Sequence, residues 1–274
     1  MRLYTSLATI RIDIGAPPRP FDPVERRSHI DTFGAAALIA FAFNLAFNQV
    51  VIKVTNGGFN PVFAAGLRSA GAVIILLIWM RMRGVSFSFA RAALPAGIFS
   101  GLLFSLEFTM LFSALDMTTV SRASVIFYSM PMWLALAAHV LLPGERLTPV
   151  KIAGLTSAMA GVALAMSDRS GGSASWTGDL LALASALCWA GIVLLIRITP
   201  LAHVPPVQQL MCQVVVSAPI LLLIAPLFGS LIRDLEMIHL FGMAYQIIAV
   251  ASLGFLAWFW LMSIYPASSV ASFS

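Results

Sequence analysis

The sequence predicts an all-α integral membrane protein, built as an inverted repeat of two five-helix units of which the second is incomplete. Three observations predict it: long apolar segments recur along the chain, charged residues are rare, and features of the first half return in the second. Of the 274 residues, 60% are hydrophobic and 10% are charged, whereas soluble domains carry roughly 25% charged residues. A helix needs about 20 apolar residues to cross a bilayer core of roughly 30 Å. We therefore expect about eight full membrane spans and a stub.

Residues 1–32 are expected to form a disordered, basic cytoplasmic tail, because they carry four prolines and five arginines and lack the apolar stretch of a secretory signal. The spans that follow are expected at residues 33–54, 61–82, 92–115, 120–142, 150–167, 180–198, 207–228 and 240–264. Pro131, Pro219 and Pro226 lie within spans and are expected to bend or interrupt their helices. A ninth span begins at Ala267 but has only eight residues, about 12 Å of helix, so the second unit is expected to be truncated.

The distribution of cations predicts that the N-terminus is cytoplasmic, because lysine and arginine are retained on the cytoplasmic side of the membrane. With this orientation, the inside joints and the tail hold eleven cations. The outside joints hold four, namely Lys53, Arg122, Arg169 and Arg233. The net charge of +5 therefore reflects membrane orientation, and no nucleic-acid partner is expected.

An internal repeat is visible at an offset of 144 residues, with units expected at residues 33–168 and 177–274. In both units a glycine precedes an alanine-rich span, a cation stands at its end, and a proline opens the next span. The corresponding pairs are Gly34 and Gly178, Lys53 and Arg197, and Pro61 and Pro205. Because the first unit contains five spans, its copy begins on the opposite face of the membrane, as in many secondary transporters.

Four stretches of the sequence carry a resemblance to a known family. They are PGERLTPVKIAGLTSAMAGVALA (143–165), ALDMTTVSRASVIFYSMPMWLALAAHVLLPGERL (114–147), GDLLALASALCWAGIVLLIR (178–197) and YPASSVAS (265–272). Together they resemble the EamA-like transporter family of the drug/metabolite transporter superfamily almost throughout, except for the tail. The resemblance implies a ten-helix carrier of the bacterial inner membrane, made of two five-helix repeats, that exports amino acids or other small metabolites.

Polar residues within the spans indicate where a substrate could bind. A charged side chain at the middle of a membrane helix costs about 2.5–3.5 kcal/mol on insertion scales, so Arg68 and Glu107 each need a reason to be there. At 1.5 Å of rise per residue, both lie roughly 10–12 Å from the outer end of their spans, as do Asn48 and Tyr128. Asn44 is one turn deeper on the face of Asn48. The sequence therefore predicts a polar cavity within the membrane, around which access could alternate.

Two interpretations of Arg68 and Glu107 stay open. They could form a structural ion pair that only locks two helices, because pairing relieves the cost of both charges. Alternatively, Glu107 exchanges a proton while Arg68 or the asparagines hold a substrate carboxylate. Trp189 is a further candidate, as a cavity wall or as a core residue, and Gln246 could line the pathway or bond across helices.

Other classes of function have little support in the sequence. It contains no GxxxxGK[ST] loop of an ATP-driven motor and no HExxH or GxSxG motif, so enzymatic activity is not expected and a membrane-embedded enzyme is a minor alternative. Cys188 and Cys212 both lie in apolar spans, so we expect no disulfide scaffold, metal site or cofactor. The expected partners are a small-molecule substrate and the lipid bilayer, and a homodimer stays open. The incomplete second unit leaves a nonfunctional transporter remnant as the main alternative.

Overall fold

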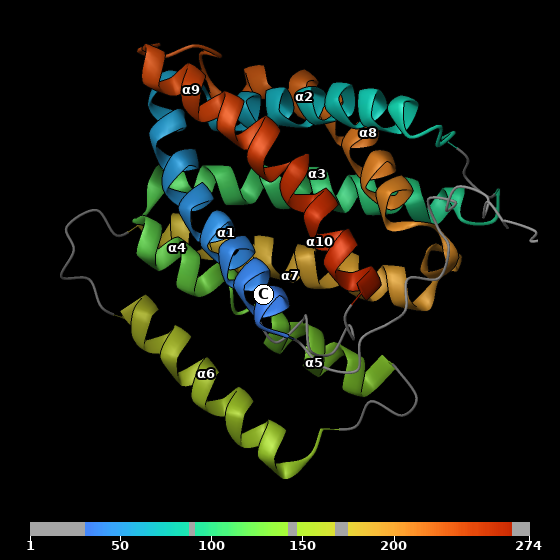
Figure 1. Ribbon diagram of the computed structural model, residues 1–274. Helices are drawn as coiled ribbons and strands as arrows, with labels where there is room; N and C mark the ends of the chain where they lie inside the picture. Colours follow the sequence, from blue (N-terminus) through green and yellow to red (C-terminus); the bar gives the residue numbers. More distant parts are fainter. Residues whose placement is uncertain (1–30, 88–90, 142–146, 168–174, 265–274) are drawn as a thin grey trace, which may run out of the picture.

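The computed structural model describes residues 31–87, 91–141, 147–167 and 175–264, and this part of the chain is almost entirely helical (Figure 1). The α-helices are α1 (Thr32–Gly58), α2 (Pro61–Met82), α3 (Leu94–Met117), α4 (Val120–Phe127), α5 (Met130–Leu141), α6 (Pro149–Ser167), α7 (Trp176–Ile198), α8 (Pro206–Ile224), α9 (Met237–Tyr245) and α10 (Leu253–Ile264). The described residues also form two 3₁₀ turns, Pro200–His203 and Ala225–Phe228, and one π-helical turn, Gln246–Val250. The ninth-span stub and nearly all of the expected tail lie outside the described residues.

All eight expected spans are helical, which confirms the all-α integral membrane fold. Seven helices within the described residues are long and apolar enough to cross a membrane, and α6 is a shorter apolar helix. The fourth span breaks between α4 and α5, just before Pro131, as expected of a proline that cannot continue the helix. Pro219 behaves differently, because α8 continues past it to Ile224. Pro226 stands in the 3₁₀ turn that ends the seventh span.

The eighth span is interrupted by the π-helical turn between α9 and α10. Such a turn disturbs the regular ladder of backbone hydrogen bonds and is often found at functional sites. Two side chains use the carbonyl groups of this region: Asn44 donates from Nδ2 to the oxygen of Ala249 (3.2 Å), and Ser252 donates from Oγ to the oxygen of Ile247 (2.8 Å). The turn is thereby attached to α1.

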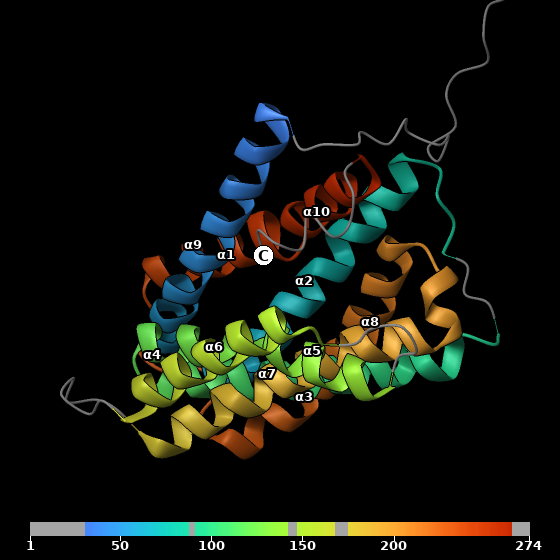
Figure 2. The ribbon, with the colours of Figure 1, turned by 90° about the horizontal axis from the view of Figure 1, so that it is seen from below.

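Helix α3 is at the centre of the bundle, where it packs against α2, α7 and α8. Phe104, Phe108 and Phe112 lie one turn apart along it, with ring centroids 4.5 and 5.8 Å apart and edges directed at neighbouring faces. Helix α7 approaches α3 closely at Gly178, because a Cβ there would lie 2.9 Å from the Cβ of Thr118. At the edge of the molecule, α6 lies against α4 and α5 (Figures 1 and 2).

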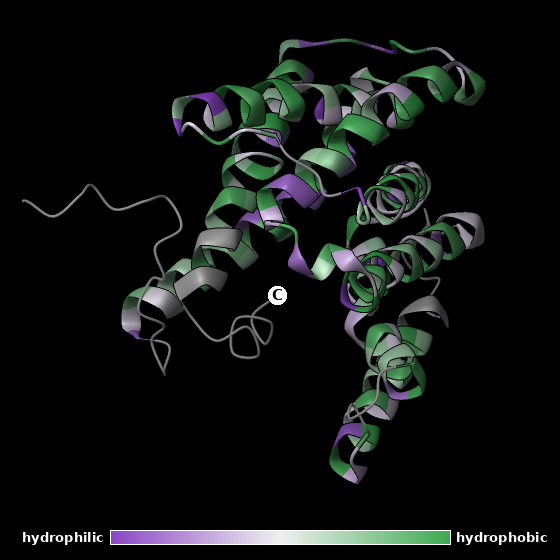
Figure 3. Cartoon of the chain, turned by 90° about the vertical axis from the view of Figure 1, so that its right-hand side faces the viewer, coloured by the Kyte–Doolittle hydropathy of each residue, from purple (hydrophilic) through white to green (hydrophobic). Residues whose placement is uncertain are grey.

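Most residues of the helices are hydrophobic (Figure 3). Large apolar side chains such as Phe43, Leu164 and Leu223 are 70%, 71% and 78% exposed. A surface this apolar is unfavourable in water and suits contact with lipid chains. Polar side chains are correspondingly buried within the bundle, where they form the candidate site and the contacts at one end.

Successive spans alternate in direction, so several helix ends meet at one end of the bundle. We call this the tied end; it comprises the junctions 58–61 and 117–120, the start of α7, and the segment 229–236 between the second 3₁₀ turn and α9. Lys53, near the C-terminal end of α1, bonds to the carbonyl oxygen of Thr118 there, and Thr118 bonds to Asp179 at the beginning of α7. Helices α1 and α7, which correspond at the 144-residue offset, therefore run in opposite directions, as an inverted repeat requires.

Candidate functional site

The two charges predicted to mark the site lie on neighbouring helices in the interior. Arg68 is 5% exposed and Glu107 is fully buried. The depth of Arg68 is set by the beginning of α2, where Pro61 takes the first helical position and the Asn60 side chain accepts hydrogen bonds from the next two free amides. Two turns further on, the Cζ atom of Arg68 lies over the ring of Phe108 on α3, 4.5 Å from its centroid.

Neither charged group has a hydrogen bond to the described residues. Both carboxylate oxygens of Glu107 and Nη1 of Arg68 are buried without a hydrogen-bond partner in the part of the chain that the structure describes. The two groups interact electrostatically. A charge without hydrogen bonds is costly in an apolar interior, so such atoms call for a water, an ion or a ligand. The arrangement leaves one acceptor group and one donor available within the membrane.

Amide side chains add further unpaired acceptors. Asn48 Oδ1 on α1 and Gln246 Oε1 at the start of the π-helical turn are buried and have no partner among the described residues. Gln246 is held by its other end, because Nε2 donates to Oγ1 of Thr55 (2.9 Å). Gln49 Oε1 on α1 is also buried without a hydrogen-bond partner among the described residues, although Gln49 was not among the predicted site residues. The signal that could have found Gln49 is its polarity within an otherwise apolar span.

Asn44 differs from Asn48, although the two were expected to act together on one face of α1. The Asn44 side chain accepts a hydrogen bond from the Tyr245 hydroxyl (2.5 Å) and donates to Ala249. Both of its polar ends therefore contact the eighth span. Asn44 joins two helices, whereas the buried Oδ1 of Asn48 has no hydrogen-bond partner in the part of the chain that the structure describes.

The aromatic candidates gather around Phe127, at the break in the fourth span. Tyr128 packs edge-on against Phe127, with centroids 5.4 Å apart, and stays 40% exposed. Trp189 of α7 packs against the same ring with centroids 6.4 Å apart and is half-buried. The structure thus brings Tyr128 and Trp189 to one aromatic cluster, while Arg68 contacts a different one on α3.

A small pocket lies beside Arg68. It is lined by Arg68, Ser69, Phe104, Phe108, Leu210, Val214, Ala251 and Phe255, which come from α2, α3, α8 and the eighth span. The pocket has room for about one water molecule in this conformation, and its lining combines apolar and aromatic walls with a single guanidinium and a hydroxyl group, which suits an anionic group beside an apolar one.

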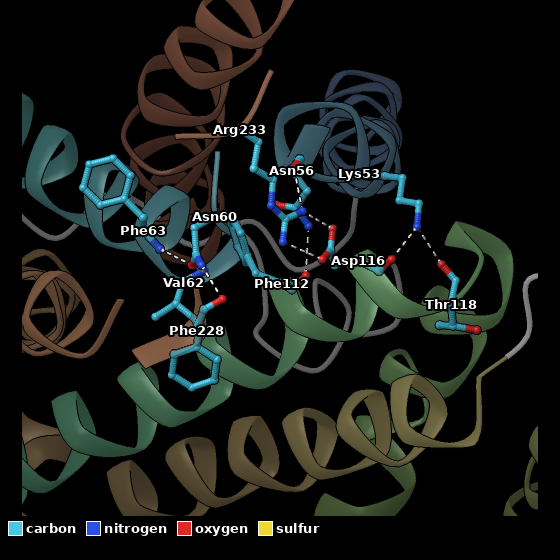
Figure 4. A network of polar contacts seen from close by, with 10 residues as sticks. All are labelled: Lys53, Asn56, Asn60, Val62, Phe63, Phe112, Asp116, Thr118, Phe228 and Arg233. Carbon is cyan, nitrogen blue, oxygen red and sulfur yellow. Dashed lines mark hydrogen bonds and ion pairs between the residues drawn. The ribbon is translucent and has the colours of Figure 1, made fainter. Parts of the chain in front are cut away.

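A second polar cluster occupies the tied end (Figure 4). It was not predicted from the sequence. Arg233, in the segment 229–236, binds both carboxylate oxygens of Asp116 at 2.9 and 3.0 Å and the carbonyl oxygen of Asn56 at 3.0 Å. Lys53 donates to the carbonyl oxygens of Asp116 and Thr118 at 3.0 and 3.1 Å. In the sequence, Lys53 and Arg233 are recognisable only as signals of membrane orientation.

A buried ion pair joins α4 to α7 at the same end. Arg122 binds Asp179 through Nε (3.2 Å) and Nη2 (2.5 Å), and Thr118 donates to the same carboxylate at 3.1 Å. Asp179 stands in the first turn of α7, where the helix dipole favours a negative charge. The pair connects the first half of the chain to the second.

Comparison with known proteins agrees with this architecture. A solved crystal structure superimposes with a TM-score of 0.60 and 25% sequence identity over 87% of this chain and 83% of that one. The aromatic amino acid exporter YddG of Ancylobacter novellus is 31% identical over 164 residues, which are 57% of this chain and 56% of the relative, so the chain matches only about half of that protein. The model of the EamA-like transporter family matches twice, at residues 32–167 and 176–274. The chain is therefore a multi-pass inner-membrane protein that belongs to the EamA-like transporter family.

Proposed function

We propose that the protein is a secondary transporter that exports small metabolites, amino acids or related solutes, across the bacterial inner membrane. Access alternates around the polar groups of α1, α2, α3 and the eighth span. The observation that carries this proposal is Glu107, whose carboxylate is fully buried with neither oxygen hydrogen-bonded in the described part of the chain. Ionisable groups within membrane spans most often mark a substrate or ion pathway.

The pocket beside Arg68 supports a substrate with a carboxylate and an apolar side group. Arg68 has a free Nη1 donor for the carboxylate, and Phe104, Phe108 and Phe255 offer ring faces and edges to the side group. The relative from Ancylobacter novellus is named as an exporter of aromatic amino acids. An aromatic amino acid is therefore the first substrate to test.

Within this proposal each polar group has a role. Glu107 carries the coupling proton, and Arg68 holds the substrate carboxylate. Asn48 and Gln246 supply acceptors for the substrate ammonium group, and Tyr128 and Trp189 line the pathway at the fourth-span break. The alternative, in which Arg68 and Glu107 only stabilise each other, predicts a different response to mutation.

The test uses the full chain in proteoliposomes with radiolabelled phenylalanine. Glu107→Gln is expected to fold and to catalyse exchange, but to lose gradient-driven export, because an amide resembles the protonated acid and cannot release a proton. Thr109→Ser, on the same helix, keeps its hydroxyl bond to Ser105 and serves as the control. Export by Glu107→Gln with the pH dependence of the parent protein would remove the coupling role.

A purely structural pair would show in stability measurements. Glu107→Gln and Arg68→Gln would then each destabilise the protein, and the double mutant would recover much of the loss. If the parent protein moves no labelled amino acid with the gradient applied in either direction, the proposed substrate class is contradicted.

We also propose that the N-terminus is cytoplasmic, which places the tied end on the outer face. The cation distribution supports this orientation. A reporter fused after Gly84 should be cytoplasmic and one fused after Gly171 should be outside; the reverse result would invert the assignment.

A further inference from the structure

We propose that the segment 229–236, hereafter the strap, is a gate that closes the tied end, and that the bond of Arg233 to Asp116 must break for this end to open. This inference rests on the proposed transport function, because a gate matters only if a substrate passes. It assigns a role to Arg233 and Asp116, which lie outside the candidate site. Four features of the strap support it.

The strap is fastened across the junction between α1 and α2. Its Leu231 carbonyl accepts from the amide of Asn60 (2.9 Å), and the amide of Arg233 donates to the carbonyl of Gly58 (3.0 Å). Between these two bonds, Phe59 and Ile232 form an antiparallel bridge. The second half of the chain thus closes over the end of the first by backbone pairing of a few residues.

Arg233 extends this attachment to α3. Its guanidinium bridges the Asn56 carbonyl on α1 and the Asp116 carboxylate at the end of α3 (Figure 4). Asn56 also donates from Nδ2 to the oxygen of Phe112 (2.9 Å). One side chain therefore joins the strap to α1 and α3. Asp116, which Arg233 binds, lies about two to three helical turns from Glu107 along α3, and each turn rises 5.4 Å.

The fastening is of a kind that can be released. The side chains of Arg233 and Asp116 are 36% and 27% exposed, so water can replace each partner when the bond breaks. Ion pairs with this exposure contribute little to stability. The strap also begins at Gly229, whose φ of 105° is a conformation that other residues rarely adopt and that lets the chain turn sharply after α8.

The contact between α1 and α3 does not depend on the strap. Lys53 holds α1 to the end of α3 through the carbonyl oxygens of Asp116 and Thr118. If the Arg233 side chain and the two backbone hydrogen bonds of the strap are released, α1 and α3 keep their own connection and the strap can move. The geometry therefore distinguishes two helices that stay connected, α1 and α3, from a strap that can move.

Accessibility of a buried thiol tests the gate in the full chain. Cys188 and Cys212 are first replaced by serine, and Ser113→Cys is added, because Ser113 is 6% exposed and lies one turn below Asp116 on the same face of α3. Membrane vesicles of both orientations are then treated with a charged maleimide that does not cross the bilayer. Arg233→Gln is expected to raise the labelling rate about fivefold or more from one side only, as loss of a weak fastening should.

Controls make the result specific. Arg81→Gln removes an equal charge at the opposite end of α2 and should leave the rate unchanged, and Arg233→Lys should fall between Arg233→Gln and the parent. The charge swap, Asp116→Arg with Arg233→Asp, should restore most of the protection. An unchanged rate in Arg233→Gln, or an equal rise from both sides, would overturn the gate.

A second measurement does not depend on a destabilised variant. Asp116→Cys with Arg233→Cys, in the background without the native cysteines, should be joined by a short bifunctional methanethiosulfonate reagent that spans the length of the lost arginine side chain, and this bridge should stop phenylalanine transport until it is reduced. Full transport by the cross-linked protein would overturn the proposal. If labelling responds as expected but no variant or parent protein moves substrate, the gate stands and the proposed transport function fails.

Discussion

Two ion pairs join the halves of this molecule at the same end, and they differ in burial. The side chains of Arg122 and Asp179 are 10% and 0% exposed, whereas those of Arg233 and Asp116 are 36% and 27% exposed. The first pair connects two packed helices, α4 and α7; the second connects the strap to α3. Since the bonded groups are the same, guanidinium and carboxylate, the surroundings decide what each pair can do.

Burial changes the consequence of breaking a pair more than it changes the bond. Removing one partner of a buried pair leaves an uncompensated charge in an apolar medium, at a cost of about 3–5 kcal/mol, whereas exposed pairs contribute about 0.2–1 kcal/mol. The Arg122–Asp179 pair is therefore suited to fixing α4 against α7 permanently. The Arg233–Asp116 pair is suited to repeated opening.

The largest effect is expected for Asp179→Asn. The amide keeps the size of the side chain but removes the negative charge that binds the buried Arg122 guanidinium, so the free energy of unfolding should fall by up to about 3–5 kcal/mol. Thermal or denaturant unfolding of the purified protein in detergent measures this. Asp116→Asn is the matched control and should cost about 1 kcal/mol or less. Equal losses for the two variants would remove the distinction between the pairs.

A smaller loss is expected for Gly178→Ala, which tests the helix contact beside the buried pair. The added Cβ would lie 2.9 Å from Thr118 Cβ and 3.1 Å from Met117 Cβ, so α7 must move away from α3. Overpacking of this kind costs about 1–3 kcal/mol. Gly154→Ala and Gly161→Ala add the same methyl group on α6, where no described atom lies within 4 Å, and should be neutral or stabilising by about 0.5–1 kcal/mol because alanine favours the helix. Comparable unfolding curves for all three variants would contradict the close contact.

The spans could be predicted from the sequence because their cause is local. Apolar length alone determines which segments can cross a bilayer, and the structure has a helix at each expected position. The break before Pro131 followed from the missing amide of proline. Helices α1 and α7 begin at Thr32 and Trp176, which are 144 residues apart.

The contacts between spans could not be predicted in the same way. Arg122 and Asp179 are 57 residues apart, and counting cations assigns a side of the membrane but no partner. Helical spacing puts Asn44 and Asn48 one turn apart on α1, yet Asn44 hydrogen-bonds to the eighth span whereas Asn48 Oδ1 has no hydrogen-bond partner among the described residues. Buried polar groups are therefore visible in the sequence, whereas their satisfaction depends on tertiary packing.

The smallest effect on stability, and the sharpest test of the comparison, is expected for Arg233→Gln and for salt. The substitution should lower the free energy of unfolding by about 1 kcal/mol or less, since both partners can be hydrated. Raising the salt concentration from 0.1 to 1 M shortens the Debye length from about 10 to about 3 Å, which weakens the exposed pair far more than the buried one. The labelling rate of Ser113→Cys should therefore rise with salt when Arg233 is present. It should not change with salt when Ser113→Cys is combined with Arg233→Gln. The stability lost in Asp179→Asn should be the same at both salt concentrations. Labelling that does not respond to salt in the parent protein would mean that the Arg233–Asp116 pair does not control access to this end of the bundle.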